Sequence, residues 1–256
     1  MAQPDIQTAA REFADAILAV DRVVVFTGAG ISTESGISDY RSQGGLWERY
    51  KPVTIQEFLA GEDARRRYWQ RKKDIYPTFA KAKPNAGHRA IAALERVGRL
   101  QVLITQNIDG LHEIAGNDPE NIIELHGTER WVKCLACEKR IPRAEVQERL
   151  EAGEEVPLCK CGGWLKPATI SFGQSLPEDI LARAFEESEN CEAFLVVGSS
   201  LLVQPAALMP GVAKHAGAWL GILNRDETPF DDVADWRVNG EAGPVLEAAM
   251  PYLLAT

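Results

Sequence analysis

The sequence contains no apolar run of about 18 residues, which is the minimum length for a helix that crosses a bilayer. It also lacks a secretory signal, because residues 1–20 place charged side chains between apolar ones with the spacing of an amphipathic helix. No internal repeat, low-complexity tract or long linker is present. We therefore expect a cytoplasmic protein with no membrane partner.

Positive charge is in short supply, since 28 Lys and Arg residues stand against 37 Asp and Glu residues and the formal net charge is −9. A net negative charge opposes non-specific binding to nucleic acid, so we expect no nucleic-acid partner. It favours basic partners instead, such as lysine-containing protein segments. The length of 256 residues fits one large domain, or one domain with a small inserted module.

Cysteine is scarce, and four of the five cysteines are paired along the chain as Cys134-x-x-Cys137 and Cys159-x-Cys161. Paired cysteines in a chain without an export signal indicate a metal site rather than disulfides. Four thiolates complete a tetrahedral zinc shell with no open position, which predicts a structural zinc site. An iron–sulfur cluster is the alternative. The fifth, Cys191, is expected to be a buried core residue.

Apolar segments of strand length alternate with segments of helical periodicity along most of the chain. The strand candidates are residues 22–26, 101–105, 122–125, 193–197, 218–223 and 236–238, and they are rich in Val, Ile and Leu. The helix candidates are residues 63–76, 85–97, 177–188, 206–216 and 242–253. This alternation predicts an α/β fold with a mostly parallel, doubly wound sheet that is covered on both faces.

Two regions interrupt the alternation. Residues 43–84 are mostly helical and rich in charge, and residues 131–167 hold the four paired cysteines. We interpret both as insertions that form a smaller second domain. Residues 1–42, 85–130 and 168–256 would then form the domain that contains the sheet.

Polar turns follow four of the predicted strands, and in an open α/β sheet such turns meet at one ligand-binding crevice. They are Gly28-Ala29-Gly30, Gln106-Asn107-Ile108-Asp109, Gly198-Ser199-Ser200 and Asn224-Arg225-Asp226. The first resembles a dinucleotide-binding turn, whose glycines let the backbone approach a pyrophosphate. However, Thr33 stands where that fingerprint has its third glycine, and a plain tight turn is the alternative. The amides and carboxylate of the second turn could hold a ribose or an amide ring, or could merely cap the strand.

His126 directly follows a predicted strand and precedes the cysteine module. A histidine with a pKa near neutrality can act as a general base, so His126 is a candidate catalytic residue. The other three histidines, His88, His112 and His215, lie in or near helical patterns, and we expect structural roles for them.

In order and spacing, these motifs resemble those of the sirtuins over residues 6–253. The matching segments are Gly28-Ala29-Gly30-Ile31-Ser32, Ser35-Gly36-Ile37, Asp39-Tyr40-Arg41, Thr105-Gln106-Asn107-Ile108-Asp109, Leu125-His126-Gly127, the paired cysteines, Phe172-Gly173 and Gly198-Ser199-Ser200-Leu201. Sirtuins are NAD-dependent protein lysine deacylases with a Rossmann-like NAD-binding domain and a small zinc-holding domain. The resemblance therefore implies NAD as a consumed co-substrate, one structural Zn²⁺, and acyl-lysine proteins or peptides as substrates.

The resemblance also implies roles for individual residues. His126 would be the general base, and Asn107 and Asp109 would line the pocket for nicotinamide and its ribose. The remaining NAD contacts would come from Gly28, Ala29, Gly30, Ser32, Asp39, Tyr40, Arg41, Gln106, Ile108, Gly198, Ser199, Ser200, Asn224, Arg225, Asp226 and the backbone near Ala242. Phe172 and Gly173 would contact the peptide substrate.

The reaction implied by the resemblance begins with attack of the acyl-lysine carbonyl oxygen on the ribose C1′ as nicotinamide leaves. The base then deprotonates a ribose hydroxyl, which attacks the imidate, and O-acyl-ADP-ribose and free lysine are released. Two alternatives use the same residues. A mono-ADP-ribosyltransferase would place a protein nucleophile where the acyl oxygen attacks, and a binding module would only sense NAD.

Within the sirtuins, Tyr68 and Arg71 resemble the Tyr-x-x-Arg pair by which class II, desuccinylase-like members read acidic acyl chains. A guanidinium and a phenol suit a terminal carboxylate because both can form charge-assisted hydrogen bonds with it. The alternative is a solvated basic helix face, since residues 65–67 and 71–73 are all Arg or Lys.

Two positions depart from the family pattern. Ser38 replaces the usual proline, which frees φ in the cofactor loop. Gln174 replaces an acidic residue after Phe172-Gly173, in a segment that pairs with the substrate backbone, so we expect an effect on affinity rather than on chemistry.

Overall fold

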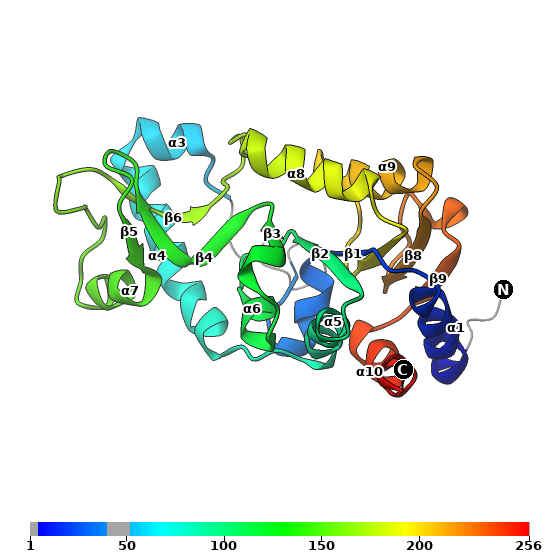
Figure 1. Ribbon diagram of the computed structural model, residues 1–256. Helices are drawn as coiled ribbons and strands as arrows, with labels where there is room; N and C mark the ends of the chain where they lie inside the picture. The colour runs from blue at the N-terminus through cyan, green and yellow to red at the C-terminus, as the bar shows by residue number, and fades with distance from the viewer. Residues whose placement is uncertain (1–4, 40–51, 256) are drawn as a thin grey trace.

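The computed structural model describes residues 5–39 and 52–255, and Figure 1 shows a larger and a smaller unit side by side. The larger unit is built on a six-stranded sheet in the order β3-β2-β1-β7-β8-β9. The strands are β1 (Val23–Thr27), β2 (Leu100–Thr105), β3 (Ile122–Glu124), β7 (Ala193–Val197), β8 (Trp219–Asn224) and β9 (Trp236–Asn239). Every neighbouring pair in this sheet is parallel, as the alternating sequence pattern predicts.

Helices cover both faces of the sheet, which explains why β1 and β7 are buried along their whole length. On one face lie α1 (Ile6–Leu18), α5 (Ala86–Arg96) and α10 (Ala242–Leu254), and on the other lie α8 (Glu178–Glu189) and α9 (Met209–His215). Each face has its own hydrophobic core, with Phe13 and Leu195 in the first and Phe26 and Phe194 in the second. The prediction of a doubly wound sheet is confirmed.

The smaller unit has a three-stranded antiparallel sheet in the order β5-β4-β6. Its strands are β4 (Gly127–Cys134), β5 (Arg140–Pro142) and β6 (Leu165–Thr169), and its helices are α3 (Ile55–Ala60), α4 (Glu62–Lys81) and α7 (Arg143–Glu151). Phe58, Trp69, Val132 and Leu165 lie in a separate hydrophobic core. The helical and cysteine-containing insertions thus pack together, as the sequence predicts.

Several elements fall outside the sequence-based prediction. They are α6 (Leu111–Ala115), all three strands of the small sheet, α7, and the 3-10 helices η1 (Ala29–Ser35), η2 (Pro119–Asn121) and η4 (Asp231–Val233). The predicted helix over residues 206–216 is divided into a 3-10 helix, η3 (Ala206–Leu208), and α9. Strand β4 also runs across residues 130 and 131, where we expected the cysteine module to begin. The elements of three to five residues carry too few apolar positions to establish a period, and the eight residues of β4 do not alternate between buried and exposed.

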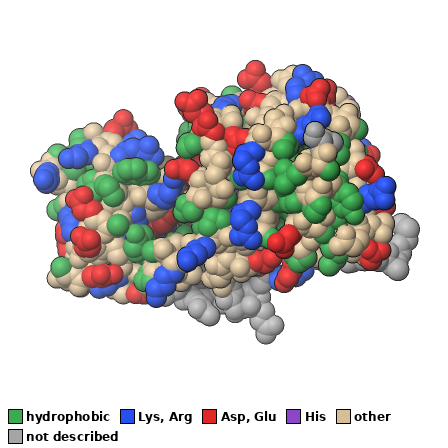
Figure 2. Space-filling view, turned by 60° about the horizontal axis from the view of Figure 1, so that its bottom comes forward, with side chains coloured by type: hydrophobic (Ala, Val, Ile, Leu, Met, Phe, Trp, Pro, Cys, Tyr) green, Lys and Arg blue, Asp and Glu red, His purple; other side chains and the backbone are tan. Residues whose placement is uncertain are grey.

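The surface carries side chains of both charges, as the numbers of acidic and basic residues in the sequence lead one to expect. Figure 2 shows two lobes with acidic and basic side chains interspersed on the face in view. None of the helices in the described part of the chain combines the length and the apolarity that a bilayer crossing requires.

Candidate active site

The four predicted turns meet at the carboxyl edge of the parallel sheet. They follow β1, β2, β7 and β8, and β1 lies between β2 and β7. The chain continues from β1 to one side of the sheet and from β7 to the other, so the boundary between these strands is a topological switch point. Ligand crevices of doubly wound sheets lie at such points.

The Gly28-Ala29-Gly30 turn packs directly on the turn after β7. The Gly30 N–H donates to the carbonyl oxygen of Gly198 at 2.8 Å. A Cβ on Gly28 would lie 2.7 Å from that same oxygen, and a Cβ on Gly30 would lie 2.8 Å from it. These glycines are therefore required for the contact between the two turns, a reason that the dinucleotide fingerprint alone does not supply.

Hydrogen bonds join the turn after β2 to both neighbouring turns. The side-chain amide of Gln106 donates to Ser199 Oγ at 2.8 Å. Asn107 Nδ2 donates to the Gly28 carbonyl oxygen and to Ser32 Oγ, both at 3.1 Å. The structure thus brings together predicted site residues from three separate turns.

Ser32 in turn donates to Asp109 Oδ2 at 2.7 Å, and the Leu111 N–H donates to Asp109 Oδ1 at 2.9 Å. Burial raises the pKa of Asp109, while the bonds from Leu111 and Ser32 lower it. The hydroxyl of Ser32 is almost completely buried by these contacts.

His126 has a defined hydrogen-bond partner. Its Nδ1 lies 2.9 Å from the main-chain carbonyl oxygen of Gln106. A carbonyl can only accept, so Nδ1 carries the proton and Nε2 is the nitrogen that can take another. Burial lowers the pKa of His126, and the bond to Gln106 opposes this shift. The imidazole is therefore neutral at pH 7 and can act as a base.

Two histidines that we expected to be structural lie directly beneath this site. His88 is fully buried, with Nε2 3.5 Å from Ser32 Oγ and Nδ1 3.0 Å from Asn85 Oδ1. His112 Nε2 lies 3.1 Å from Thr27 Oγ1. Burial is the main cause that lowers the pKa of His88 to about 4, and the charge of Arg89 adds to it. Burial also lowers the pKa of His112 well below its usual value, and the neighbouring His88 adds to that shift.

Sequence reasoning missed this buried polar layer, which also contains Thr27, Asn85 and Thr105. Thr27 Oγ1 donates to Thr105 Oγ1 at 2.8 Å, and Asn85 Nδ2 donates to the Ile31 carbonyl oxygen. One signal was available, because Asn85 begins α5 and forms a capping box with His88.

The residues predicted to contact the far half of NAD follow β7 and β8 or begin α10. Arg225 Nη2 is 3.7 Å from Asp39 Oδ2, and Asn224 Nδ2 donates to the Asp226 carbonyl oxygen at 2.8 Å. Ala242 begins α10, where the next N–H, of Gly243, donates to Glu34 Oε1 at 2.8 Å. Ser200 follows Ser199 at the end of β7. Tyr40 and Arg41 lie outside the described residues.

The predicted substrate residues fall into two groups. Phe172 is half-exposed, its carbonyl oxygen accepts from the Ile55 N–H, and Gly173 accepts from Gln56, so both lie beside α3. Tyr68 is only 6% exposed and packs edge-on against Phe58 in the small-unit core. Arg71 follows one turn later on α4 and is partly buried, and its Nε has no hydrogen-bond partner among the described residues.

The four paired cysteines form one cluster. Their Sγ atoms all lie within 4.8 Å of one another, with Cys134 and Cys161 at 3.6 Å and Cys137 and Cys159 at 3.8 Å. A tetrahedral Zn–S shell requires S–S separations of about 3.8 Å, so the cluster fits zinc. The Cys137 N–H, and then the Ala136 N–H, lower the pKa of Cys134 to about 6, which favours the ligating thiolate. Gly163 leaves room for the sulfur, because a Cβ there would lie 2.7 Å from Cys134 Sγ.

Comparison with known proteins agrees with this geometry. A model of the Sir2 family matches residues 28–205. An NAD-dependent protein deacetylase of Rhodopseudomonas palustris is 43% identical over 96% of this chain and 98% of its own length. An NAD-dependent protein deacylase of Archaeoglobus fulgidus is 42% identical over 92% of both chains. A solved structure of Sir2 with a p53 peptide and NAD⁺ is 37% identical, covers 94% of this chain and 97% of its own, and has a TM-score of 0.86. The chain belongs to the Sir2 family, the sirtuins.

Proposed function

We propose that this protein is an NAD-dependent protein lysine deacylase, which transfers the acyl group of acyl-lysine to ADP-ribose and releases nicotinamide. Family membership and the activities of relatives that match nearly the whole chain support this assignment. The four-cysteine cluster fits the structural zinc that such a protein needs.

The contact between His126 and Gln106 carries the proposal. The 2.9 Å bond from Nδ1 to a carbonyl oxygen leaves Nε2 as the proton acceptor, and burial keeps the ring neutral. In the proposed reaction, the acyl-lysine oxygen displaces nicotinamide at C1′, and His126 Nε2 then removes a proton from a ribose hydroxyl. The resulting alkoxide attacks the imidate carbon, and the lysine amine leaves with the proton that His126 took up. Water then adds to the remaining cyclic intermediate, which opens to O-acyl-ADP-ribose.

Asn107 and Asp109 act at the nicotinamide end of the same site in this proposal. Their side chains are held by Ser32, Gly28 and Leu111, so their positions are established before the ligand enters. Preorganised polar groups cost little reorganisation when charge develops at the ribose. The Gly28, Gly198 and Asn224 turns are left to hold the phosphates and the adenosine.

The experiment that tests this function uses an acetyl-lysine peptide, NAD and the purified protein, with products identified by mass. We expect free lysine peptide, nicotinamide and O-acetyl-ADP-ribose in equal amounts. The His126→Ala variant should lose product formation while it still binds ADP-ribose. Label from NAD that stays on protein without release of O-acetyl-ADP-ribose would instead identify a mono-ADP-ribosyltransferase, and NAD binding without turnover would identify a sensing module.

The acyl group that the protein prefers depends on the residues that would contact the end of the acyl chain. We infer from the Tyr-x-x-Arg resemblance that acidic acyl groups are candidate substrates, with Arg71 as the group that would bind their carboxylate. The partly buried guanidinium of Arg71, with its unpartnered Nε among the described residues, supports this role. The burial of Tyr68 in the small-unit core supports packing as its main role, so the pair's assignment depends on Arg71.

The domain boundaries and the cellular location of the protein are also proposals. We infer an NAD-binding domain of residues 1–42, 85–130 and 168–256 and a small domain of residues 43–84 and 131–167, acting on protein substrates in the cytoplasm. Limited proteolysis followed by mass mapping would test the limits, and cell fractionation would test the location.

A further inference from the structure

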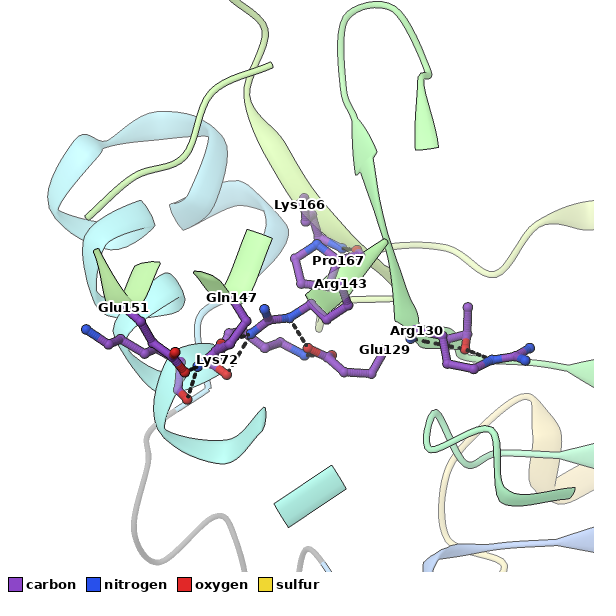
Figure 3. A network of polar contacts seen from close by, with 10 residues as sticks. Lys72, Glu129, Arg130, Arg143, Gln147, Glu151, Lys166 and Pro167 are labelled. Atoms are coloured by element: carbon purple, nitrogen blue, oxygen red, sulfur yellow. Dashed lines mark hydrogen bonds and ion pairs between the residues drawn. The ribbon is translucent and has the colours of Figure 1, made fainter. Parts of the chain in front are cut away.

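Two adjacent residues on β4, Glu129 and Arg130, lie where this strand of the small unit meets the candidate active site. Successive side chains of a strand point to opposite faces. Figure 3 shows the consequence: Glu129 points toward Arg143 and Lys72, while Arg130 points the other way. Sequence reasoning assigned neither residue a role.

The Glu129 side chain belongs to a buried ion network. Its Oε1 accepts from Arg143 Nε at 3.1 Å and its Oε2 from Lys72 Nζ at 2.5 Å. Glu129 is 5% exposed and Arg143 is 1% exposed. A carboxylate at this depth is retained only when its partners are fixed, so the network defines the position of β4 relative to α4 and α7.

The same network holds α4 where Pro77 interrupts the hydrogen-bond ladder of the helix. Pro77 lacks the N–H that would bond to the Lys73 carbonyl oxygen, and Gln147 Nε2 donates to that oxygen instead, at 3.3 Å. Arg143 Nη2 donates to the preceding carbonyl oxygen, of Lys72, at 2.9 Å. After this point α4 leaves the small unit and the chain continues to α5 of the larger unit.

From this anchored strand, the Glu129 main chain reaches the active-site turn. Its N–H donates to the carbonyl oxygen of Ile108 at 2.8 Å, between Asn107 and Asp109. A displacement of β4 therefore moves the turn that we assign to nicotinamide.

Arg130 holds the same turn from the other face of β4. Its guanidinium forms ion pairs with Glu113 on α6 and with Glu124 at the end of β3, and its Nε donates to Thr128 Oγ1 at 3.2 Å. Its aliphatic chain lies on Gly110, where a Cβ would come within 2.6 Å of Arg130 Cδ. Gly110 has φ +73°, so both its conformation and this contact require glycine.

The packing beside this turn is incomplete. A cavity with room for about one water molecule lies there, with Asn107, Asp109, His112 and Glu124 in its wall. Among the described residues, His112 Nδ1 has no hydrogen-bond partner. The position of the turn therefore depends on specific contacts, and β4 supplies two of them: the hydrogen bond from the Glu129 N–H and the packing of Arg130 on Gly110.

We propose that Glu129 and Arg130 are positioning residues for nicotinamide binding, which couple the small-unit ion network to the Asn107–Gly110 turn. Neither residue contacts a reacting atom in this proposal. The inference rests on the proposed function, because that function assigns the turn to nicotinamide.

The test compares ligands that do and do not reach this turn. Nicotinamide inhibition and the KM for NAD report on the turn, whereas the Kd for ADP-ribose, which lacks nicotinamide, reports on the rest of the site. We expect Arg130→Met to weaken nicotinamide inhibition and raise the KM for NAD about tenfold, since small misplacements of positioning groups have large effects. The Kd for ADP-ribose should change less than about twofold.

The matched control is Lys133→Met on the same strand, which removes an exposed ion pair with Glu138 and touches no part of the turn. It should leave all three constants unchanged. Arg130→Lys, which keeps the charge, should restore part of the nicotinamide effect. Glu129→Gln keeps the N–H to Ile108 but loses the network charge, and should shift the same two constants.

Unchanged nicotinamide constants in Arg130→Met and Glu129→Gln would overturn the proposal. So would a parallel loss of ADP-ribose binding, because that loss indicates a general structural role. A wild-type protein that releases no nicotinamide from NAD would refute the proposed function itself, so the two failures are distinguishable.

Discussion

His126 Nδ1 lies 2.9 Å from the main-chain carbonyl oxygen of Gln106, whose side-chain amide donates to Ser199 Oγ. One residue of the turn after β2 therefore orients the histidine with its main chain and holds the turn after β7 with its side chain. This arrangement determines the tautomer of His126 and holds its ring against the turn after β2.

A pH profile follows from this contact. The base must be unprotonated, and burial lowers the pKa of His126 below its ordinary 6.5. We expect kcat/KM with acetyl-lysine peptide to be constant at pH 7 and to fall only as the pH drops through a value below 6.5. An acid limb centred above pH 7 would contradict the assignment. His215→Ala, at an exposed helix end, should leave the profile unchanged.

Stability should depend on pH through His88. Burial lowers its folded-state pKa to about 4 from 6.5, so the unfolded chain takes up a proton first as the pH falls. Above pH 6.5 the imidazole is neutral in both the folded and the unfolded state, so His88 does not make stability depend on pH there. As the pH falls from 6.5 toward 4, this group lowers the free energy of unfolding by about 3 kcal/mol. Chemical denaturation at pH 7 and pH 4.5 measures the loss. His88→Gln should reduce the pH dependence; His215→Gln should not.

Because Gly28 packs directly on Gly198, we expect the methyl group of an alanine at position 28 to lower the stability of the protein. A Cβ at position 28 would lie 2.7 Å from the Gly198 carbonyl oxygen, which the Gly30 N–H holds by a hydrogen bond, so Gly28→Ala should destabilise the protein by about 1–3 kcal/mol. Gly61→Ala is the matched control, because nothing lies within 4 Å of a Cβ there. Equal urea midpoints for the two variants would show that the turns are not in contact.

Loss of one zinc ligand should unfold the small unit. We expect Cys159→Ser to be purified with little zinc by elemental analysis and to lose the cooperative transition of that unit, since structural zinc binding is coupled to folding. Cys191→Ala, a buried cysteine outside the cluster, should retain one zinc per chain. A folded Cys159→Ser protein without metal would contradict a structural role.

The proposed carboxylate-binding role of Arg71 can be tested by acyl-chain selection. If its guanidinium binds a carboxylate, Arg71→Met should lower kcat/KM for succinyl-lysine or glutaryl-lysine peptides by about tenfold or more and leave acetyl-lysine nearly unchanged. Arg67→Met, on the exposed face of the same helix, is the control. Equal losses on acidic and neutral acyl groups would remove the carboxylate-binding role.

The regular elements of the fold were predictable because each carries a repeating signal. The six strands of the large sheet are apolar runs, and the predicted limits of β7 match the structure residue for residue. The α4 helix extends further than its pattern indicated, through Pro77, because Gln147 replaces the hydrogen bond that proline removes. Strands β5 and β6 escaped prediction because they are short, and β4 because its polar and apolar residues do not alternate; all three are stabilised by pairing and by the cysteine cluster.

The sequence by itself was enough to predict the family and the cysteine cluster, because motif spacing encodes them. It also predicted the doubly wound sheet and the turns after its strands, because the periodicity of apolar residues marks strands and helices. Tertiary structure alone decided which nitrogen of His126 is free, that His88 lies under Ser32, and that Glu129 and Arg130 anchor the Asn107–Gly110 turn. These features depend on contacts between residues far apart in the chain. A charged residue in a sequence looks the same whether it is solvated or buried against a partner, and only folding distinguishes the two.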